Sequence, residues 1–176
     1  MPWLKAGQQA LDRFVDDEDR ALLRRQVESY EKLRVNGREI PTGPIHGDLF
    51  KDNALFDEGK LSGVIDFYNA CTDWLLLDVA IAINDWCLIP GRAQLDVELS
   101  QTLLFAYQRI RPFTAAERQV WQAVLCIAAT RFWVSRLMGH HVPELLGGAV
   151  KTKDPNAFKN LLLSHLADVP PLPAAV

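Results

Sequence analysis

Apolar positions in the first 36 residues recur at the spacing of an α-helix. One helix is predicted over residues 3–15, with an apolar face made of Leu4, Leu11, Phe14 and Val15. Residues 17–19 are all acidic, and carboxylates favour a helix start because they stabilise the positive end of the helix dipole. The second helix begins there and ends before Asn36-Gly37, and its apolar positions are Leu23, Val27, Tyr30 and Leu33.

The helical period then stops. Residues 40–44 contain two prolines and a glycine, which predicts a loop. Residues 54–56 and 61–67 are rich in apolar and β-branched residues and flank the turn-forming Asp57-Glu58-Gly59-Lys60. This pattern predicts a β-hairpin that brings residue 66 back beside residue 53.

The second half of the chain is predicted to be helical. A segment that begins at Asp73-Trp74 is apolar nearly all round as far as Ile83, which is typical of a buried helix. Another helix is expected over residues 91–111, with an inner face made of Leu95, Leu99, Thr102, Leu103, Ala106 and Tyr107.

The C-terminal third contains two clear helix starts. Thr114 and Glu117 have the spacing of a capping box, which starts a long helix from Ala115 to about Met138. Residues 139–148 are expected to form a loop, and Asp154-Pro155 begins a last helix that ends near Leu166. We therefore expect one α+β domain, mostly helical, over residues 1–176, with a flexible tail from about residue 168.

Composition narrows the possible functions. The net charge of −3 and the lack of any Lys/Arg cluster disfavour a nucleic-acid or anionic-membrane surface. Cys71, Cys87 and Cys126 lack metal-binding spacing, so we expect reduced thiols in a cytoplasmic protein and no zinc site. The adjacent His140 and His141 have no suitably spaced partner and are not expected to bind a metal.

The candidate chemistry lies in residues 46–53, His-Gly-Asp-Leu-Phe-Lys-Asp-Asn, and in Asp66 of Val-Ile-Asp-Phe. In the pattern H-x-D-x-x-x-x-N, Asp48 faces an acceptor hydroxyl and Asn53 reaches a magnesium ion from the same loop. Asp66 would supply a second oxygen ligand, and Mg²⁺ needs few protein ligands because phosphates and water fill its other positions. The sequence therefore predicts a phosphoryl-transfer centre.

These motifs resemble the aminoglycoside phosphotransferase and choline kinase superfamily of small-molecule kinases. Further matches narrow the resemblance to bacterial homoserine kinases: residues 46–56, 62–68, 131–137 and 153–155. The resemblance implies ATP and Mg²⁺ as cofactors and homoserine as the acceptor, on the path to threonine. It also implies that Asp78 supports the catalytic loop through its backbone, while His46 packs beneath that loop.

The same resemblance implies the C-terminal lobe of a protein-kinase-like fold, with a small β-hairpin that carries the catalytic and metal-binding loops. The 44 residues before Ile45 contain no G-x-G-x-x-G. We therefore expect the N-terminal lobe and its adenine-binding residues to be absent, and the 176-residue chain to be inactive alone. Only eleven residues separate Asp66 from Asp78, too few for a peptide-docking activation segment, which favours a small-molecule acceptor.

Arg131 and Arg136 lie in an otherwise apolar helix and are expected to find anionic partners. They would either pair with Asp73, Asp78 or Asp85, or capture the carboxylate of an amino-acid substrate. Lys51 and Asp52 are read as solvated loop charges. Phe50 stands where protein kinases place a lysine, and Tyr68 replaces the glycine of D-F-G, so control by activation-loop phosphorylation is not expected.

Other functions remain open at this stage. The acceptor could be an aminoglycoside or a choline-like alcohol instead of homoserine. The chain could also be a non-catalytic helical binding module derived from a kinase, although it retains all three of Asp48, Asn53 and Asp66. A metallophosphoesterase is a weaker alternative because the histidine-rich ligands of a dinuclear site are missing from the sequence.

Overall fold

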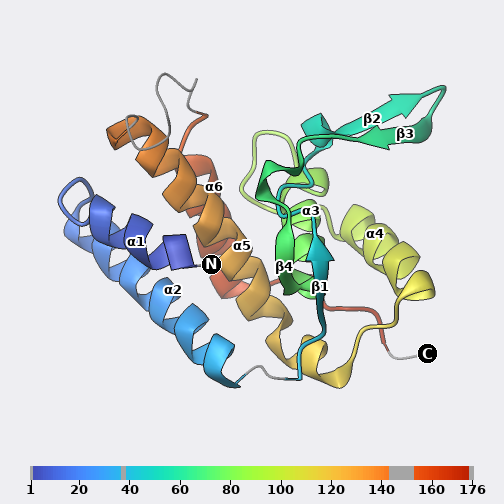
Figure 1. The fold of residues 1–176 in the computed structure, drawn as a ribbon, viewed down its shortest axis with the longest axis horizontal. Helices are drawn as coiled ribbons and strands as arrows, with labels where there is room; N and C mark the ends of the chain where they lie inside the picture. The colour runs from blue at the N-terminus through green and yellow to red at the C-terminus, as the bar shows by residue number, and fades with distance from the viewer. Residues whose placement is uncertain (1, 37–38, 143–152, 175–176) are drawn as a thin grey trace.

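The computed structural model describes residues 2–36, 39–142 and 153–174. It has a helix-rich α+β architecture with two small antiparallel sheets (Figure 1). Its α-helices are α1 Pro2–Leu11, α2 Asp17–Asn36, α3 Leu75–Trp86, α4 Val97–Ile110, α5 Ala115–His141 and α6 Asn156–Ala167. Its strands are β1 Thr42–Ile45, β2 Ala54–Asp57, β3 Lys60–Val64 and β4 Cys71–Trp74, and two short 3-10 helices are η1 Lys51–Asn53 and η2 Phe67–Asn69.

The long helix α5 is the centre of the fold, and α1, α2, α3 and α6 all pack against it (Figure 1). The predicted capping box is present at its start: Glu117 N–H donates to Thr114 Oγ1 at 3.2 Å, and Thr114 N–H donates to Glu117 Oε2 at 2.8 Å. These bonds satisfy amides that a helix N-terminus would otherwise leave unpaired. The predicted helix start at Ala115 is confirmed.

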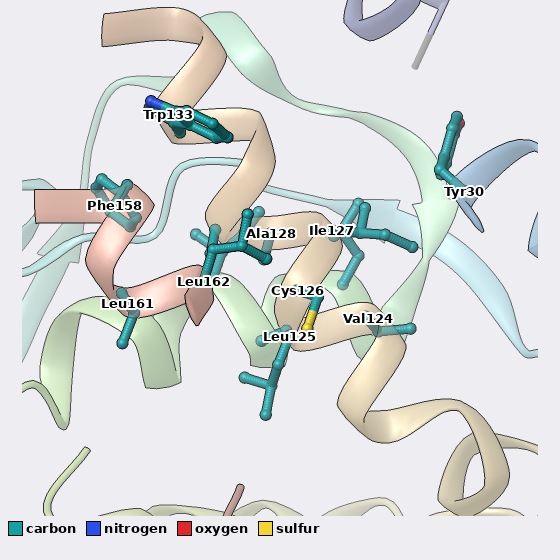
Figure 2. Close-up of a cluster of buried hydrophobic side chains, with 14 of the residues drawn as sticks. Tyr30, Val124, Leu125, Cys126, Ile127, Ala128, Trp133, Phe158, Leu161 and Leu162 are labelled. Atoms are coloured by element: carbon teal, nitrogen blue, oxygen red, sulfur yellow. The ribbon is translucent and has the colours of Figure 1, made fainter. Parts of the chain in front are cut away.

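Buried apolar side chains from all of the described α-helices form one connected cluster around α5, to which the β2–β3 hairpin contributes none. Figure 2 shows the run from Val124 to Ala128 of α5 beside Phe158, Leu161 and Leu162 of α6. From α2, the predicted positions Leu23, Val27 and Tyr30 are buried in the same cluster. The helical periodicity of the sequence therefore identified this part of the core.

The predicted hairpin is confirmed as β2 and β3, which projects from the helical body (Figure 1). Its turn places Glu58 and Gly59 at φ values of +47° and +76°. Two successive positive φ values match the right-handed twist of the strands, as in type I′ turns. Ala54 pairs with Val64, so residues 53 and 65 come out side by side at the base of the hairpin.

The second sheet was not predicted. Residues 42–45 form strand β1, which pairs antiparallel with β4, so the prediction of a loop over residues 40–44 is wrong. Proline is tolerated in β1 because this sheet has two strands only, and an edge strand does not need every amide. Pairing with β1 also keeps Asp73 and Trp74 extended, and helix α3 therefore begins at Leu75, later than expected.

Helix α4 begins at Val97, not near residue 91, because Asp96 caps it by accepting from Leu99 N–H at 2.9 Å. The expected inner face is correct in part: Leu95 is buried, and Leu103 and Tyr107 pack against the core, whereas Leu99 is 48% exposed. The buried residues within the helix are Ser100, Leu104 and Gln108. Ser100 Oγ donates to Asp96 C=O at 2.6 Å, and Gln108 Nε2 donates to Ala174 C=O at 2.9 Å, so both buried polar side chains have partners.

The segment after α6 was expected to be a flexible tail, but it packs against the rest of the fold. Through residue 174 it lies against α4 and α5, and its backbone carbonyls accept hydrogen bonds from side chains of both helices. The pairs are Gln101 with Pro171, Gln108 with Ala174, Arg118 with Pro173, and Trp121 with Pro170. Hydrogen bonds to its backbone carbonyls hold this segment in place, and such bonds leave no hydrophobic pattern in the sequence.

Smaller differences concern helix ends and cysteines. Helix α1 ends at Leu11, and α5 continues to His141, so the loop expected over residues 139–148 does not begin at 139; residues 143–152 lie outside the described part. Cys71 is exposed, whereas Cys87 and Cys126 are buried, and all three are free thiols. None of the described helices has the length and apolar character needed to cross a membrane.

Candidate active site

The loop from His46 to Asn53 connects β1 to the hairpin, and helix α3 holds its first half. Asp78 accepts from the backbone amides of His46 and Gly47, at 2.8 Å each, through its two carboxylate oxygens. Hydrogen bonds to backbone amides satisfy a carboxylate that would be costly to bury alone. The structure therefore places Asp78 under the loop backbone and directs it away from the solvent-facing side chains.

His46 lies beneath the loop and is 7% exposed. Its Nδ1 accepts from Asp48 N–H at 3.2 Å, so Nε2 carries the proton and donates to Ile65 C=O at 2.9 Å. The ring also contacts Phe67, with centroids 4.7 Å apart. His46 thus joins the loop to the segment that carries Asp66.

The base of the hairpin brings three residues of the candidate site close together: Asp48, Asn53 and Asp66. The side-chain Nδ2 of Asn53 donates to the backbone carbonyl of Asp48 at 2.8 Å. The backbone carbonyl of Asn53 accepts from Ile65 N–H at 3.0 Å, which places Asp66 next to it along the chain. Local spacing and the hairpin register therefore produce this convergence.

The donor set suits a hard cation. Because Nδ2 of Asn53 is engaged with Asp48, its Oδ1 faces the other way and could bind a metal. Asp66 has a left-handed backbone, with φ +66° and ψ +60°, and its exposed carboxylate has no hydrogen bond or ion pair within the described residues. Amide and carboxylate oxygens are the ligands that Mg²⁺ prefers.

Burial and neighbouring charges shift the pKa of the half-buried Asp48 carboxyl. Burial raises its pKa above the ordinary value, and the nearby Asp66 carboxylate raises the pKa further. Arg131 and His46 lower the pKa again, and so does the side-chain amide of Asn69, whose Nδ2 lies 3.5 Å from Asp48 Oδ2. A carboxylate with a raised pKa is a stronger base than an exposed one, which suits it to accept a hydroxyl proton.

Arg131 and Arg136 occupy different environments on α5. Arg131 is 7% exposed, donates to the backbone carbonyl of Gly47, and its pKa is lowered by burial. Arg136 is half-buried, stacks over Phe158 at 4.3 Å from the ring centroid, and donates to Asp154 C=O at 2.8 Å. Only Arg131 contacts the backbone beside Asp48.

The carboxylates considered as partners for these arginines have further contacts. Asp73 accepts from Arg34 at 2.6 Å, and Asp85 accepts from Lys51 N–H at 2.8 Å. Asp52 pairs with Lys153 at 3.1 Å, while both side chains remain largely exposed. Asp85 and Lys153 therefore contact the far end of the loop, near η1.

Sequence reasoning missed two contributors to the site. Phe50 is buried, and its ring contacts Phe132 and Phe158 at centroid distances of 4.5 and 6.1 Å, which anchors the loop to α5 and α6. Asn69 reaches Asp48 from η2, three residues after Asp66. Phe50 had a signal, as an apolar residue at a position where kinases carry lysine, whereas Asn69 had none.

A pocket of about 480 Å³ lies between β1, α3 and α4. Its lining is almost entirely apolar and includes Leu49, Trp86 and Tyr107. Trp86 Nε1 donates to Leu49 C=O at 3.0 Å and closes one wall. An apolar lining offers few partners to the charged oxygens of a triphosphate.

Comparisons with known proteins identify the family of this chain. Residues 1–113 match the model of the phosphotransferase enzyme family. The chain is similar to the homoserine kinase of Burkholderia ambifaria strain MC40-6, with 39% identity over 98% of this chain and 55% of that protein. It is also similar to the homoserine kinase of Methylobacillus flagellatus, with 42% identity over 94% of this chain and 50% of that protein. The chain spans about half the length of these curated relatives.

Proposed function

The chain belongs to the phosphotransferase enzyme family, and from this premise we propose that it carries the catalytic face of an ATP-dependent homoserine kinase. The reaction would transfer the γ-phosphoryl group of ATP to the side-chain hydroxyl of L-homoserine, giving O-phospho-L-homoserine and ADP. The names of the curated relatives support homoserine as the acceptor. The retained site residues favour this proposal over a non-catalytic binding module.

In the proposed reaction, Asp48 orients the acceptor hydroxyl and accepts its proton. The acceptor oxygen forms a bond to the γ-phosphorus while the bond from that phosphorus to the β,γ-bridging oxygen breaks. Asn53 Oδ1 and the Asp66 carboxylate would bind Mg²⁺, which neutralises charge on the phosphate oxygens when it is bound. Asp78 would act through the loop backbone alone, whereas His46 would also link that backbone to Ile65.

One observation carries this assignment. Asn53 binds the backbone of Asp48 with its side chain, at 2.8 Å, and the backbone of Ile65 with its carbonyl, at 3.0 Å. The residue proposed as a metal ligand thus also fixes the spacing between the proposed base and the second ligand. Proximity and orientation supply a large part of the rate enhancement in phosphoryl transfer.

We further propose that residues 1–176 fold as one unit, a kinase-like C-terminal lobe, because their buried apolar residues form one cluster. The sequence has no glycine-rich phosphate-binding loop, so activity assays should use the complete protein that contains these residues. For the carboxylate of homoserine, Arg136 is the better candidate of the two arginines, since it is half-buried and lies over Phe158, whose ring is 6.1 Å from that of Phe50 in the loop.

The test is a panel of acceptors. The complete protein is incubated with ATP, Mg²⁺ and homoserine, choline or an aminoglycoside, and the phosphorylated product is identified by mass spectrometry. Homoserine should give the highest kcat/KM. A preference for choline or an aminoglycoside would support phosphotransferase activity but contradict homoserine as the acceptor. The absence of a phosphorylated product with every hydroxyl compound would contradict the proposed kinase function.

A further inference from the structure

Two helices, α3 and α5, hold the backbone of Gly47, the residue before Asp48. Its N–H donates to Asp78 of α3 at 2.8 Å, and its C=O accepts from Arg131 of α5, 84 residues later in the chain. Its φ of +75° is in the left-handed region, and a Cβ at this position would lie 2.7 Å from the backbone oxygen of Asn69 in η2. Gly47 is therefore fixed by long-range contacts as well as by its own conformation.

The contacts of Gly47 determine where the Asp48 side chain points. The Gly47 C=O and the Asp48 N–H belong to one planar peptide group. Arg131 holds the oxygen of that group, and His46 Nδ1 accepts from its N–H at 3.2 Å. Since both ends of the plane are held, its rotation is restricted, and the Cα–Cβ direction of Asp48 is restricted with it.

Arg131 is well suited to this structural task. Its side chain is 7% exposed, and its guanidinium carbon lies 5.1 Å from the centroid of the Phe132 ring. A planar guanidinium that stacks on an aromatic ring has few orientations available, so its donors are held in place. Helix α5 is the most extensively packed helix of the fold, which makes it a rigid support for the loop.

We propose that Arg131 is a positioning residue for Asp48 and not a ligand of the acceptor carboxylate, because it holds the peptide group between Gly47 and Asp48. This inference rests on the proposed kinase function, in which Asp48 acts on the hydroxyl. Arg131 then acts through the backbone and need not touch the substrate. Its loss should impair the chemical step more than the binding of either substrate.

The kinetic test compares Arg131→Met and Arg131→Lys in the complete protein. Displacing a catalytic group by about 1 Å can lower the rate roughly 100-fold, so Arg131→Met should lower kcat by at least about tenfold. The KM values for acceptor and ATP should stay within about twofold of the wild type. Arg131→Lys can still donate to the Gly47 carbonyl and should recover part of kcat.

Arg118→Met is the matched control, because Arg118 also lies on α5 and donates to a backbone carbonyl, that of Pro173, away from the loop. It should lower thermal stability without a selective loss of kcat. A large rise in the acceptor KM of Arg131→Met with unchanged kcat would overturn the proposal, as would unchanged kinetics. If Arg131→Met does not fold, Arg131→Lys decides by the same criteria.

Amide hydrogen exchange separates failure of this proposal from failure of the kinase function. The amides of Gly47 and Asp48 should exchange faster in Arg131→Met than in Arg118→Met. This readout does not need a substrate, so it remains valid if no acceptor is phosphorylated. Equal exchange at these two amides in both variants would overturn the positioning role, whatever the activity of the protein.

Discussion

The side-chain amide of Asn53 donates to the backbone carbonyl of Asp48 at 2.8 Å, which closes the loop between them into a compact turn. The geometry leaves the amide oxygen of Asn53 for a metal. Asn53→Ala removes both functions. The Mg²⁺ concentration for half-maximal activity should rise at least about tenfold, and kcat should fall.

A magnesium titration of the steady-state rate measures this effect, and Asn156→Ala, an exposed asparagine at the start of α6, is the control. If Asn53→Ala responds to Mg²⁺ as the wild type does, Asn53 is not a metal ligand.

Gly47 and Gly59 have nearly the same φ, +75° and +76°, but different surroundings. Alanine at 59 meets no atom within 4 Å, so it should cost only the left-handed strain, about 1 kcal/mol of unfolding free energy. Alanine at 47 meets the Asn69 oxygen at 2.7 Å, and the backbone must move.

The Gly47→Ala variant should therefore lose clearly more unfolding free energy than Gly59→Ala, as well as catalytic activity. Urea denaturation of the two variants gives the comparison. Equal losses in both would show that the contact between Gly47 and Asn69 is not tight in solution.

Several of these contacts were predictable from the sequence and others were not. The hairpin and the convergence of Asn53 with Asp66 followed from short-range spacing and turn chemistry. Strand β1 was missed because its partner β4 lies about 30 residues later, and its prolines indicate a loop when read locally.

The contact of Arg131 with Gly47 spans 84 residues, and the docked tail is held by backbone carbonyls. Neither feature leaves a periodic pattern in the sequence. Local chemistry therefore predicted the reacting groups, whereas the groups that hold them required the tertiary structure.

His165 gives the core a dependence on pH. Its ring is buried, Nε2 lies 2.7 Å from Asn84 Oδ1, and burial lowers its pKa from 6.5 to about 4. Between these two values the unfolded chain binds the proton and the folded chain does not, so stability falls as the pH falls. The loss should be about 3 kcal/mol between pH 7 and pH 4.

Urea denaturation at several pH values measures this slope, and the difference between the wild type and His165→Gln isolates the contribution of His165. An unchanged slope in His165→Gln would mean that His165 is already protonated in the folded protein at these pH values.

The most direct test of the proposed site is Asp48→Asn in the complete protein, assayed for O-phosphohomoserine by mass spectrometry. Asparagine keeps the shape of the side chain but cannot accept the hydroxyl proton, so kcat should fall at least about 100-fold, while the Kd for ATP changes less than about twofold. Asp52→Asn, at an exposed residue of the same loop, should retain normal turnover. Turnover by Asp48→Asn within about threefold of the wild type would contradict the assignment of Asp48 as the residue that acts on the acceptor.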